Sequence, residues 1–139
     1  MKILLAVDGS EHSRRAVDFV ANAGWLQAGS ELLVFTAVAP LPRRVEKMAD
    51  PELVQRNYLT EAEEILSPVR KRLATIGMPV RCDWAVGPPA EAIVETAEKA
   101  QPYLIVMGSH GLGALSNLVM GSVATRVLAS CTVPVLLVR

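Results

Sequence analysis

Five short apolar runs alternate along the chain with four longer segments in which apolar residues recur at helical spacing. In most of the runs Val, Ile and Leu follow one another without polar alternation, which is typical of strands buried on both faces of a parallel sheet. The third run places Arg81 and Asp83 on one face, so we expect that strand near an edge of the sheet. The predicted strands are residues 3–7, 32–38, 80–86, 104–107 and 133–138.

The first two helical segments follow the first and second runs. The first begins after Ser10, a predicted N-cap, and stops at Gly29. The second spans residues 51–76, and Pro68 inside it predicts a bend or a break. The inward positions are Ala16, Val17, Phe19, Val20, Ala23 and Leu26 in the first segment, and Leu59, Ala62, Leu66, Val69, Leu73 and Ile76 in the second.

Two shorter helices complete the pattern, at residues 89–100 and 122–130. Residues 39–50 show no periodicity and are rich in proline and basic side chains. We expect a mobile surface loop there, with a basic lid over an anionic ligand as the alternative. The inward positions are Ala92, Ile93, Thr96 and Ala97 in the third helix, and Val123, Val127 and Leu128 in the fourth.

The order of the elements is β-α-β-α-β-α-β-α-β, which predicts an α/β fold: a three-layer open sheet of five parallel strands with helices on both faces. Right-handed crossovers leave few topologies, and the commonest has strand order 3-2-1-4-5. The winding then reverses between strands 1 and 4, and ligands of open α/β sheets bind in the crevice that opens there. We therefore expect one domain, residues 1–139, with its ligand at residues 8–10 and 108–121.

The segment after the fourth run is rich in glycine and leads into a helix. Gly108, Gly111 and Gly113 can adopt positive φ and let backbone N–H groups approach a ligand closely. Gly121 and Ser122 stand where the fourth helix begins, and a helix N-terminus offers unpaired N–H groups and a positive dipole end. Together these features predict a backbone cradle for an anion.

The charge distribution is compatible with a phosphate held by backbone groups. Fourteen acids balance fourteen bases, and no acid lies after residue 98. No Lys or Arg occurs between residues 100 and 125, so we expect binding without fast phosphoryl transfer. A net charge of zero and an aromatic content of 4% argue against nucleic-acid binding.

Other phosphate-binding signatures are absent from the sequence. There is no G-x-x-x-x-G-K-[ST], which excludes a P-loop ATPase. Residues 108–113 read G-x-x-G-x-G, which is not the dinucleotide-binding order and follows the fourth strand instead of the first. A response regulator would need an Asp at the end of the third strand, where the sequence reads Ala85-Val86-Gly87.

The sequence also bears on the compartment. The apolar run at residues 3–7 is shorter than the core of a secretory signal, and no apolar stretch approaches the roughly 20 residues that span a bilayer. Cys82 and Cys131 lie far apart and show no metal-type spacing. We expect a cytoplasmic protein with reduced thiols and no membrane contact.

Several of these motifs resemble one known family. Gly108-x-x-Gly111, nine further residues and then Gly121-Ser122 resemble the nucleotide-binding signature of the universal stress protein family. The sequences ILLAVDGS at residues 3–10 and VPVLLV at residues 133–138 are similar to that family's first and last strands. The resemblance covers essentially the whole chain and implies a small α/β domain, usually a homodimer, in a branch that binds ATP.

The resemblance also implies a set of site residues. The glycines and Ser122 would hold the ribose and phosphates of ATP, or of AMP or ADP, and the backbone near Ala37 would read adenine. Asp8 would reach the ribose or a divalent metal, Mg²⁺ or Mn²⁺, bound through the nucleotide. The implied nucleotide-binding residues are Ala6, Val7, Asp8, Ala37, Met107, Gly108, His110, Gly111, Gly121, Ser122 and Val123.

The chain departs from the family's pattern in two places. The second strand of the family often ends His-Val-x-Asp, whereas residues 36–39 read Thr-Ala-Val-Ala. Many relatives carry Arg inside the glycine-rich segment, where this chain has Leu112 and Asn117. A backbone contact to adenine survives a change of side chain, whereas the missing Arg predicts a lower affinity or a preference for fewer phosphates.

Three polar residues have two interpretations each. Asp8 either contacts the ligand or caps the first helix, in a capping box with Glu11. Ser122 either contacts phosphate or is a plain N-cap. His110 either lines the pocket or takes part in catalysis, and we expect His12 at the surface.

Three functional hypotheses follow. The first is an ATP-binding regulator of the stress response whose nucleotide occupancy tunes its interactions. The alternatives are a slow metal-dependent ATP hydrolase, assisted by Asp8 or His110, and a nucleotide-free dimeric adaptor. The last strand is apolar yet terminal, and pairing with a second copy would cover such an edge, which predicts a homodimer through the C-terminal strand.

Overall fold

The five strands form one parallel sheet, in the order β3-β2-β1-β4-β5. The computed structural model describes residues 1–111 and 120–139. The strand order and the edge position of β3 confirm the predictions from the sequence. The strands are β1 (Lys2–Ala6), β2 (Glu31–Val38), β3 (Val80–Val86), β4 (Leu104–Gly108) and β5 (Val135–Val138).

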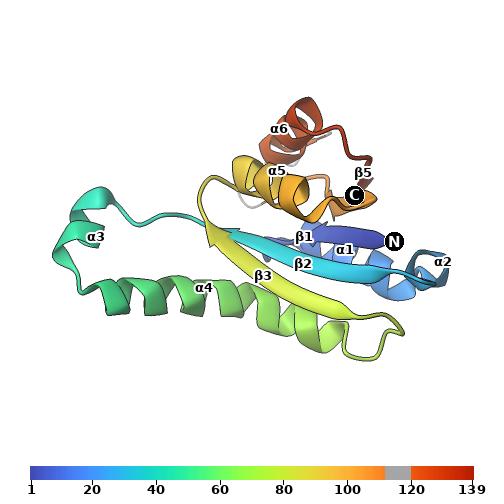
Figure 1. Ribbon diagram of the computed structural model, residues 1–139, viewed down its shortest axis with the longest axis horizontal. Coiled ribbons are helices and arrows are strands. Elements are labelled where there is room, and N and C mark those ends of the chain that lie inside the picture. Colours follow the sequence, from blue (N-terminus) through green and yellow to red (C-terminus); the bar gives the residue numbers. More distant parts are fainter. Residues whose placement is uncertain (112–119) are drawn as a thin grey trace.

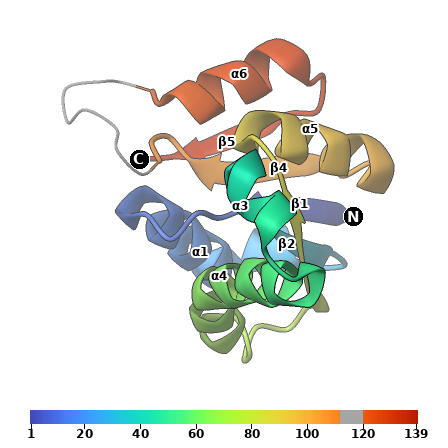
Figure 2. The same cartoon turned by 90° about the vertical axis from the view of Figure 1, so that its left-hand side faces the viewer.

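Helices cover both faces of this sheet and make three layers. On one face lie α1 (Glu11–Asn22) and α4 (Pro51–Arg72), and on the other α5 (Pro89–Ala100) and α6 (Ser122–Ser130), as Figures 1 and 2 show. The last two helices have the bounds that the sequence predicts. No helix among residues 1–111 and 120–139 is long and apolar enough to cross a membrane.

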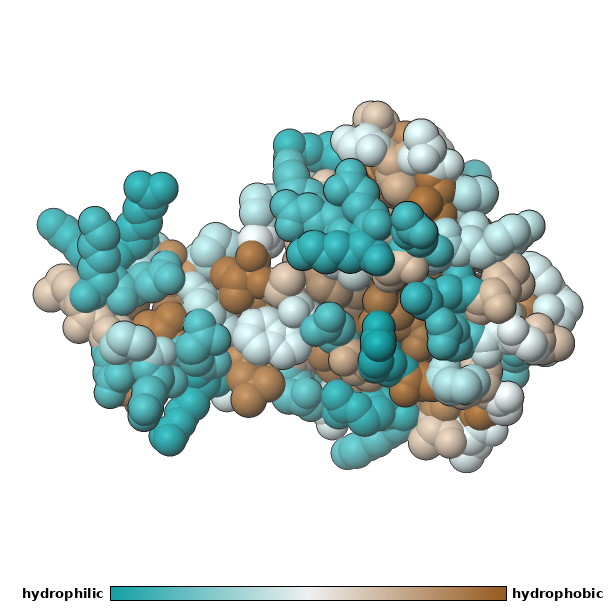
Figure 3. Space-filling model, in the orientation of Figure 1, coloured by the Kyte–Doolittle hydropathy of each residue, from teal (hydrophilic) through white to brown (hydrophobic). Residues whose placement is uncertain are grey.

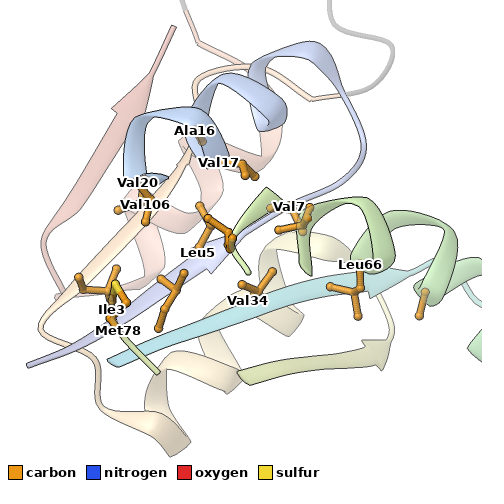
Figure 4. Close-up of a cluster of buried hydrophobic side chains, with 14 of the residues drawn as sticks. Ile3, Leu5, Val7, Ala16, Val17, Val20, Val34, Leu66, Met78 and Val106 are labelled. Atoms are coloured by element: carbon orange, nitrogen blue, oxygen red, sulfur yellow. The ribbon is translucent and has the colours of Figure 1, made fainter. Parts of the chain in front are cut away.

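The alternation of side chains along the strands divides the core in two. Ile3 and Leu5 of β1 point toward α1 and α4, where Leu66 and Val20 also pack (Figure 4). The intervening Leu4 belongs to the second cluster, under α5 and α6. Because both faces of the central strands are buried, the sequence shows continuous apolar runs instead of alternation.

The first helical segment is interrupted where the sequence predicts one helix. Ser10 caps α1 as expected, its hydroxyl accepting from the backbone N–H of Ser13. The helix ends at Asn22, because Ala23 leaves helical geometry and donates to the carbonyl of Val20. A second short helix, α2 (Gly24–Gln27), then buries Leu26. The predicted apolar face is kept, although the helix is divided.

The long helix α4 runs unbroken through Pro68, so the expected break does not occur. Pro68 and Glu64, whose carbonyl loses its intrahelical donor, are both exposed, so water can replace the missing bond. Leu59 is 47% exposed and not inward, whereas its neighbour Tyr58 is buried. The phenol oxygen of Tyr58 accepts from the backbone N–H of Leu41, which explains how a polar-tipped side chain fits there.

Two other predictions for single elements are wrong. Residues 39–50, expected as a loop, contain the short helix α3 (Arg43–Met48), which buries none of its residues. Figure 3 shows mostly hydrophilic side chains over this part of the molecule. In α6 the buried residues are Ala124 and Val127, whereas Leu128, predicted to face inward, is 43% exposed.

Candidate functional site

A cavity of about 500 Å³ opens at the carboxyl ends of the strands, where β1 and β4 lie side by side. This is the point at which the winding of the sheet reverses, the usual position of a ligand in an open α/β sheet. All the site residues implied by the sequence line the cavity: Ala6, Val7, Asp8, Ala37, Met107, Gly108, His110, Gly111, Gly121, Ser122 and Val123. The fold therefore brings together two segments that are far apart in the chain.

Gly108 allows the first turn of α1 to pack on the end of β4. A Cβ atom at this position would lie 2.8 Å from the carbonyl carbon of His12 and 2.9 Å from its Cβ. Neither Gly108 nor Gly111 has a positive φ, so the conformations open only to glycine are not used at these two positions. Their role is close approach, since a Cβ on Gly111 would lie 2.7 Å from Oδ2 of Asp8. Gly113, the third glycine of the predicted cradle, lies outside the described residues.

Ser109 joins the two ends of the glycine-rich segment. Its backbone N–H donates to the carbonyl of Val138 at 2.8 Å, and its carbonyl accepts from the N–H of Gly121 at 2.6 Å. The amide of Gly121 is therefore already used within the protein and is not one of the donors of the predicted cradle. The donors that this helix end offers begin at Ser122, because the first N–H groups of an α-helix have no intrahelical partner.

Ser122 is the first residue of α6, and Gly121 is its N-cap. The interpretation of Ser122 as a plain N-cap is therefore wrong. The side chain of Ser122 is exposed and lies among the residues that line the cavity. A hydroxyl at the first helical position, next to the positive end of the helix dipole, suits a negatively charged ligand.

Asp8 does not cap α1, because that position belongs to Ser10. Its Oδ1 accepts from the backbone N–H of Ser10 at 2.9 Å, and its own N–H donates to the Ser13 hydroxyl at 3.1 Å. Glu11 forms an ion pair with Arg15 at 2.7 Å, not a capping box. These bonds fix the Asp8 carboxylate with Oδ2 close to Gly111, at the cavity.

His110 lines the cavity and contacts a second histidine. Its ring packs against that of His12 in a tilted contact, with centroids 4.7 Å apart and planes inclined by 45°. Nδ1 of His110 lies 3.0 Å from the Ser109 hydroxyl. His12 is partly exposed, and its contact with His110 is not predicted from the sequence.

The charged side chains among the described lining residues are both acidic: Asp8 and Glu61. His110 is the lining residue in that set that can carry a positive charge. In the described part of the chain, no group of three or more His, Cys, Asp or Glu side chains could hold a metal ion. Leu112 and Asn117 lie outside the described residues.

Sequence reasoning missed several lining residues. Phe35 could have been found, since it lies on the same face of β2 as Ala37. Glu61 and Ile65, one turn apart on α4, carry no signal in the sequence because only packing brings that helix to the cavity. The full set of missed residues is Ser13, Phe35, Val38, Ala39, Glu61, Ile65, Pro89, Ile93 and Ala124.

Comparison with known proteins is consistent with this geometry. The profile of the universal stress protein family matches residues 1–139. The Thermus aquaticus protein described as "Universal stress protein in QAH/OAS sulfhydrylase 3'region" is 41% identical over 139 residues, covering 99% of this chain and 97% of that protein.

Solved structures show the same architecture. Protein MJ0577 of Methanocaldococcus jannaschii matches with a TM-score of 0.81 and 31% identity, covering 99% of this chain and 94% of that one. A universal stress protein from Archaeoglobus fulgidus, solved in complex with dAMP, matches with a TM-score of 0.72 and 25% identity, covering 100% of this chain and 98% of that one.

Proposed function

Because the chain belongs to the universal stress protein family, we propose that its cavity at the β1–β4 junction binds an adenine nucleotide. The observation that carries this proposal is the convergence of the whole family signature on one cavity of about 500 Å³. The dAMP complex of the Archaeoglobus fulgidus relative supports the same ligand class. Residues 1–139 act as one nucleotide-binding unit in this proposal.

The two ends of the cavity differ in chemistry, and this orients the nucleotide. Phe35, Ala37 and Ile93 lie on the same face of the sheet and give an apolar wall to the cavity, which suits the flat face of a base. Gly111 and the first turn of α6 at Ser122 give backbone N–H groups and a helix N-terminus, which suit phosphates. Asp8 lies between them, next to Gly111, and its carboxylate can accept from a ribose hydroxyl.

We further propose ATP as the ligand, accompanied by Mg²⁺ or Mn²⁺ that enters with the phosphates. A metal carried by the nucleotide offsets the charges of Asp8 and Glu61, which otherwise repel a polyphosphate. Asp8 is the lining carboxylate that would face such an ion, directly or through water. The protein would then act in the cytoplasm as a nucleotide-dependent regulator of the stress response, and as a homodimer joined through β5.

Calorimetric titration with ATP and Mg²⁺ tests the nucleotide proposal. We expect wild-type protein to bind with a dissociation constant on the order of micromolar, since several backbone hydrogen bonds and a buried base together reach that range. Gly121→Val should bind at least about tenfold more weakly, because side-chain atoms would enter the cavity and crowd His110, whose Cα is 3.1 Å from a Cβ at Gly121.

The matched control is Gly77→Val. A Cβ at Gly77 meets no atom within 4 Å, and the residue has no positive φ, so this variant should bind as the wild type does. Equal ATP affinity in Gly121→Val and the wild type would contradict the proposal. Native mass spectrometry of freshly purified protein adds an independent readout, since a bound nucleotide is identified by its mass.

A further inference from the structure

Two histidines from distant parts of the chain meet beside the proposed nucleotide site. His12 lies in the first turn of α1, and His110 follows β4 and lines the cavity. Their rings make a tilted contact at a centroid distance of 4.7 Å with planes inclined by 45°. Neither the β1–α1 turn nor the glycine-rich segment needs this ring contact for its own local structure, so we considered a role for it in ligand binding.

The main chain fixes both partners of this pair. The backbone of His12 packs closely on the end of β4, since a Cβ at Gly108 would lie only 2.8 Å from its carbonyl carbon. His110 is held by Ser109, which is 3% exposed and bonds through its N–H to Val138 and through its carbonyl to Gly121. The contact between the two rings is therefore supported by two segments whose main chains are held in place.

Nδ1 of His110 lies 3.0 Å from the hydroxyl of the buried Ser109, and the tautomer of the ring decides which of the two groups donates. When the hydroxyl donates, the ring proton of a neutral imidazole lies on Nε2. Nε2 is then the donor, and a phosphate oxygen is a strong acceptor. The Ser109 hydroxyl and the His12 ring both contact the imidazole and so limit its orientation.

A phosphate bound in this cavity would require a hydrogen-bond donor of this kind. Asp8 and Glu61, the charged lining side chains in the described part, are both acidic. The sequence contains no Lys or Arg between residues 100 and 125, so the whole glycine-rich segment offers no permanent cation to a phosphate. His110 is the described lining side chain able to donate to phosphate with a full or partial positive charge.

We propose that His12 is a positioning residue for phosphate recognition: with Ser109, it holds the imidazole of His110 so that Nε2 donates to a phosphate of the bound nucleotide. The inference rests on the proposed nucleotide function and names the side chain that takes the place of a Lys or Arg. It predicts a role for His12 that depends entirely on His110 and concerns the phosphates, not the nucleoside.

A calorimetric comparison of ATP with adenosine separates this role from a general effect on folding. His110→Ala should weaken ATP binding about tenfold and change adenosine affinity by no more than about twofold, since one hydrogen bond to a charged group is lost. His12→Ala should weaken ATP binding by roughly three- to tenfold, again without an effect on adenosine. The double variant should bind ATP no more weakly than His110→Ala, because His12 acts through His110.

Conservative variants complete the design. His12→Phe keeps a ring against His110 and should restore ATP affinity, whereas His110→Phe keeps the packing but removes the donor and should not. Asn22→Ala, at the far end of α1, should behave as the wild type. Thermal unfolding of each variant shows whether it is folded, and the two Phe variants decide the outcome if either Ala variant is not.

Four results would overturn the proposal. Equal losses for ATP and adenosine in His12→Ala indicate a structural role, and additive losses in the double variant show that the two histidines act separately. Unchanged ATP affinity in His12→Ala removes the positioning role but leaves the nucleotide function standing. Absence of ATP and adenosine binding in the wild type removes both.

Discussion

At the scale of single residues, the glycines near the site serve packing more than backbone conformation. Gly108 leaves room for the backbone of His12, and Gly111 leaves room for the Asp8 carboxylate. Positive φ occurs instead at Gly9, in the turn between β1 and α1. The sequence could predict a role for Gly108 and Gly111 in the site, since they form a spaced motif. It could not predict that this role is to leave room for other segments, because the atoms that would clash with a Cβ belong to His12 and Asp8.

The ion pair of Arg70 and Glu63 on α4 allows a prediction about pH. Arg70 donates to both carboxylate oxygens, at 3.0 Å and 3.2 Å. These hydrogen bonds, with the positive charge of Arg70, hold the pKa of Glu63 below its ordinary value of 4.5. Because the folded-state pKa is lowered, the stabilisation is present at pH values above the unfolded-state pKa and is lost as the pH falls through the folded-state pKa.

Carboxyl-carbon NMR titration of Glu63 tests this prediction. In Arg70→Gln the Glu63 midpoint should rise toward the ordinary value, because the donor and the charge are removed together. Both side chains are nearly half exposed, so solvent screening keeps the effect on stability small. A Glu63 midpoint that is the same in both proteins would show that the pair does not persist in solution.

At the scale of elements, the sequence prediction for the buried face of α4 was wrong at one position, where it named Leu59 instead of the adjacent Tyr58. The buried residues Val54, Tyr58, Ala62, Leu66 and Val69 follow steps of three or four residues. Leu59 is apolar but lies one residue, about 100° of rotation, away from that stripe. Hydrophobicity favoured Leu59 over Tyr58, and only the hydrogen bond from Leu41 to the Tyr58 hydroxyl makes the tyrosine suitable for burial.

A pair of leucine truncations on α4 tests this register. Leu66→Ala should lower the free energy of unfolding by about 2–5 kcal/mol, because Leu66 is 1% exposed and its removal leaves a cavity. Leu59→Ala should change it by less than about 1 kcal/mol, since this side chain is 47% exposed. Urea unfolding gives both values. Equal losses in the two variants would contradict the assigned register.

At the scale of the whole molecule, the sheet has two edges of different character. β3 forms one edge with alternating exposure, whereas β5 forms the other with apolar side chains that are all only partly buried. The carbonyl of Pro134 accepts from Ile105 of β4 and that of Val138 from Ser109 directly after β4. The backbone polar groups of Val135 and Leu137 therefore point away from the sheet. An apolar edge with outward donors is the kind of surface that a second copy would pair with.

Sedimentation analysis tests the proposed homodimer. The wild type should sediment as a dimer, and Val135→Pro as a monomer, because proline removes an outward N–H while leaving the bonds to β4 in place. Trp25→Ala serves as the control, since Trp25 is a 69% exposed apolar residue on α2, far in sequence from β5. A dimer that survives Val135→Pro would place the interface elsewhere.

Local patterns decided the elements and their order. Strands buried on both faces leave continuous apolar runs, and right-handed crossovers then leave few arrangements, so the sheet order and the position of the crevice followed from the sequence. The spaced motif of Gly108, Gly111 and Gly121-Ser122 predicted the same crevice. It begins at the end of β4, which is one of the two strands beside that crevice.

Contacts between distant segments were decided only by the tertiary structure. The sequence could not show that the Gly121 N–H donates to the Ser109 carbonyl, that the His12 ring contacts His110, or that α4 brings Glu61 to the cavity. Each of these depends on how elements approach one another, which periodicity along one segment does not encode. The sequence thus determined where a ligand would bind, and the packing of α1, α4 and α6 around that place determined which groups face it.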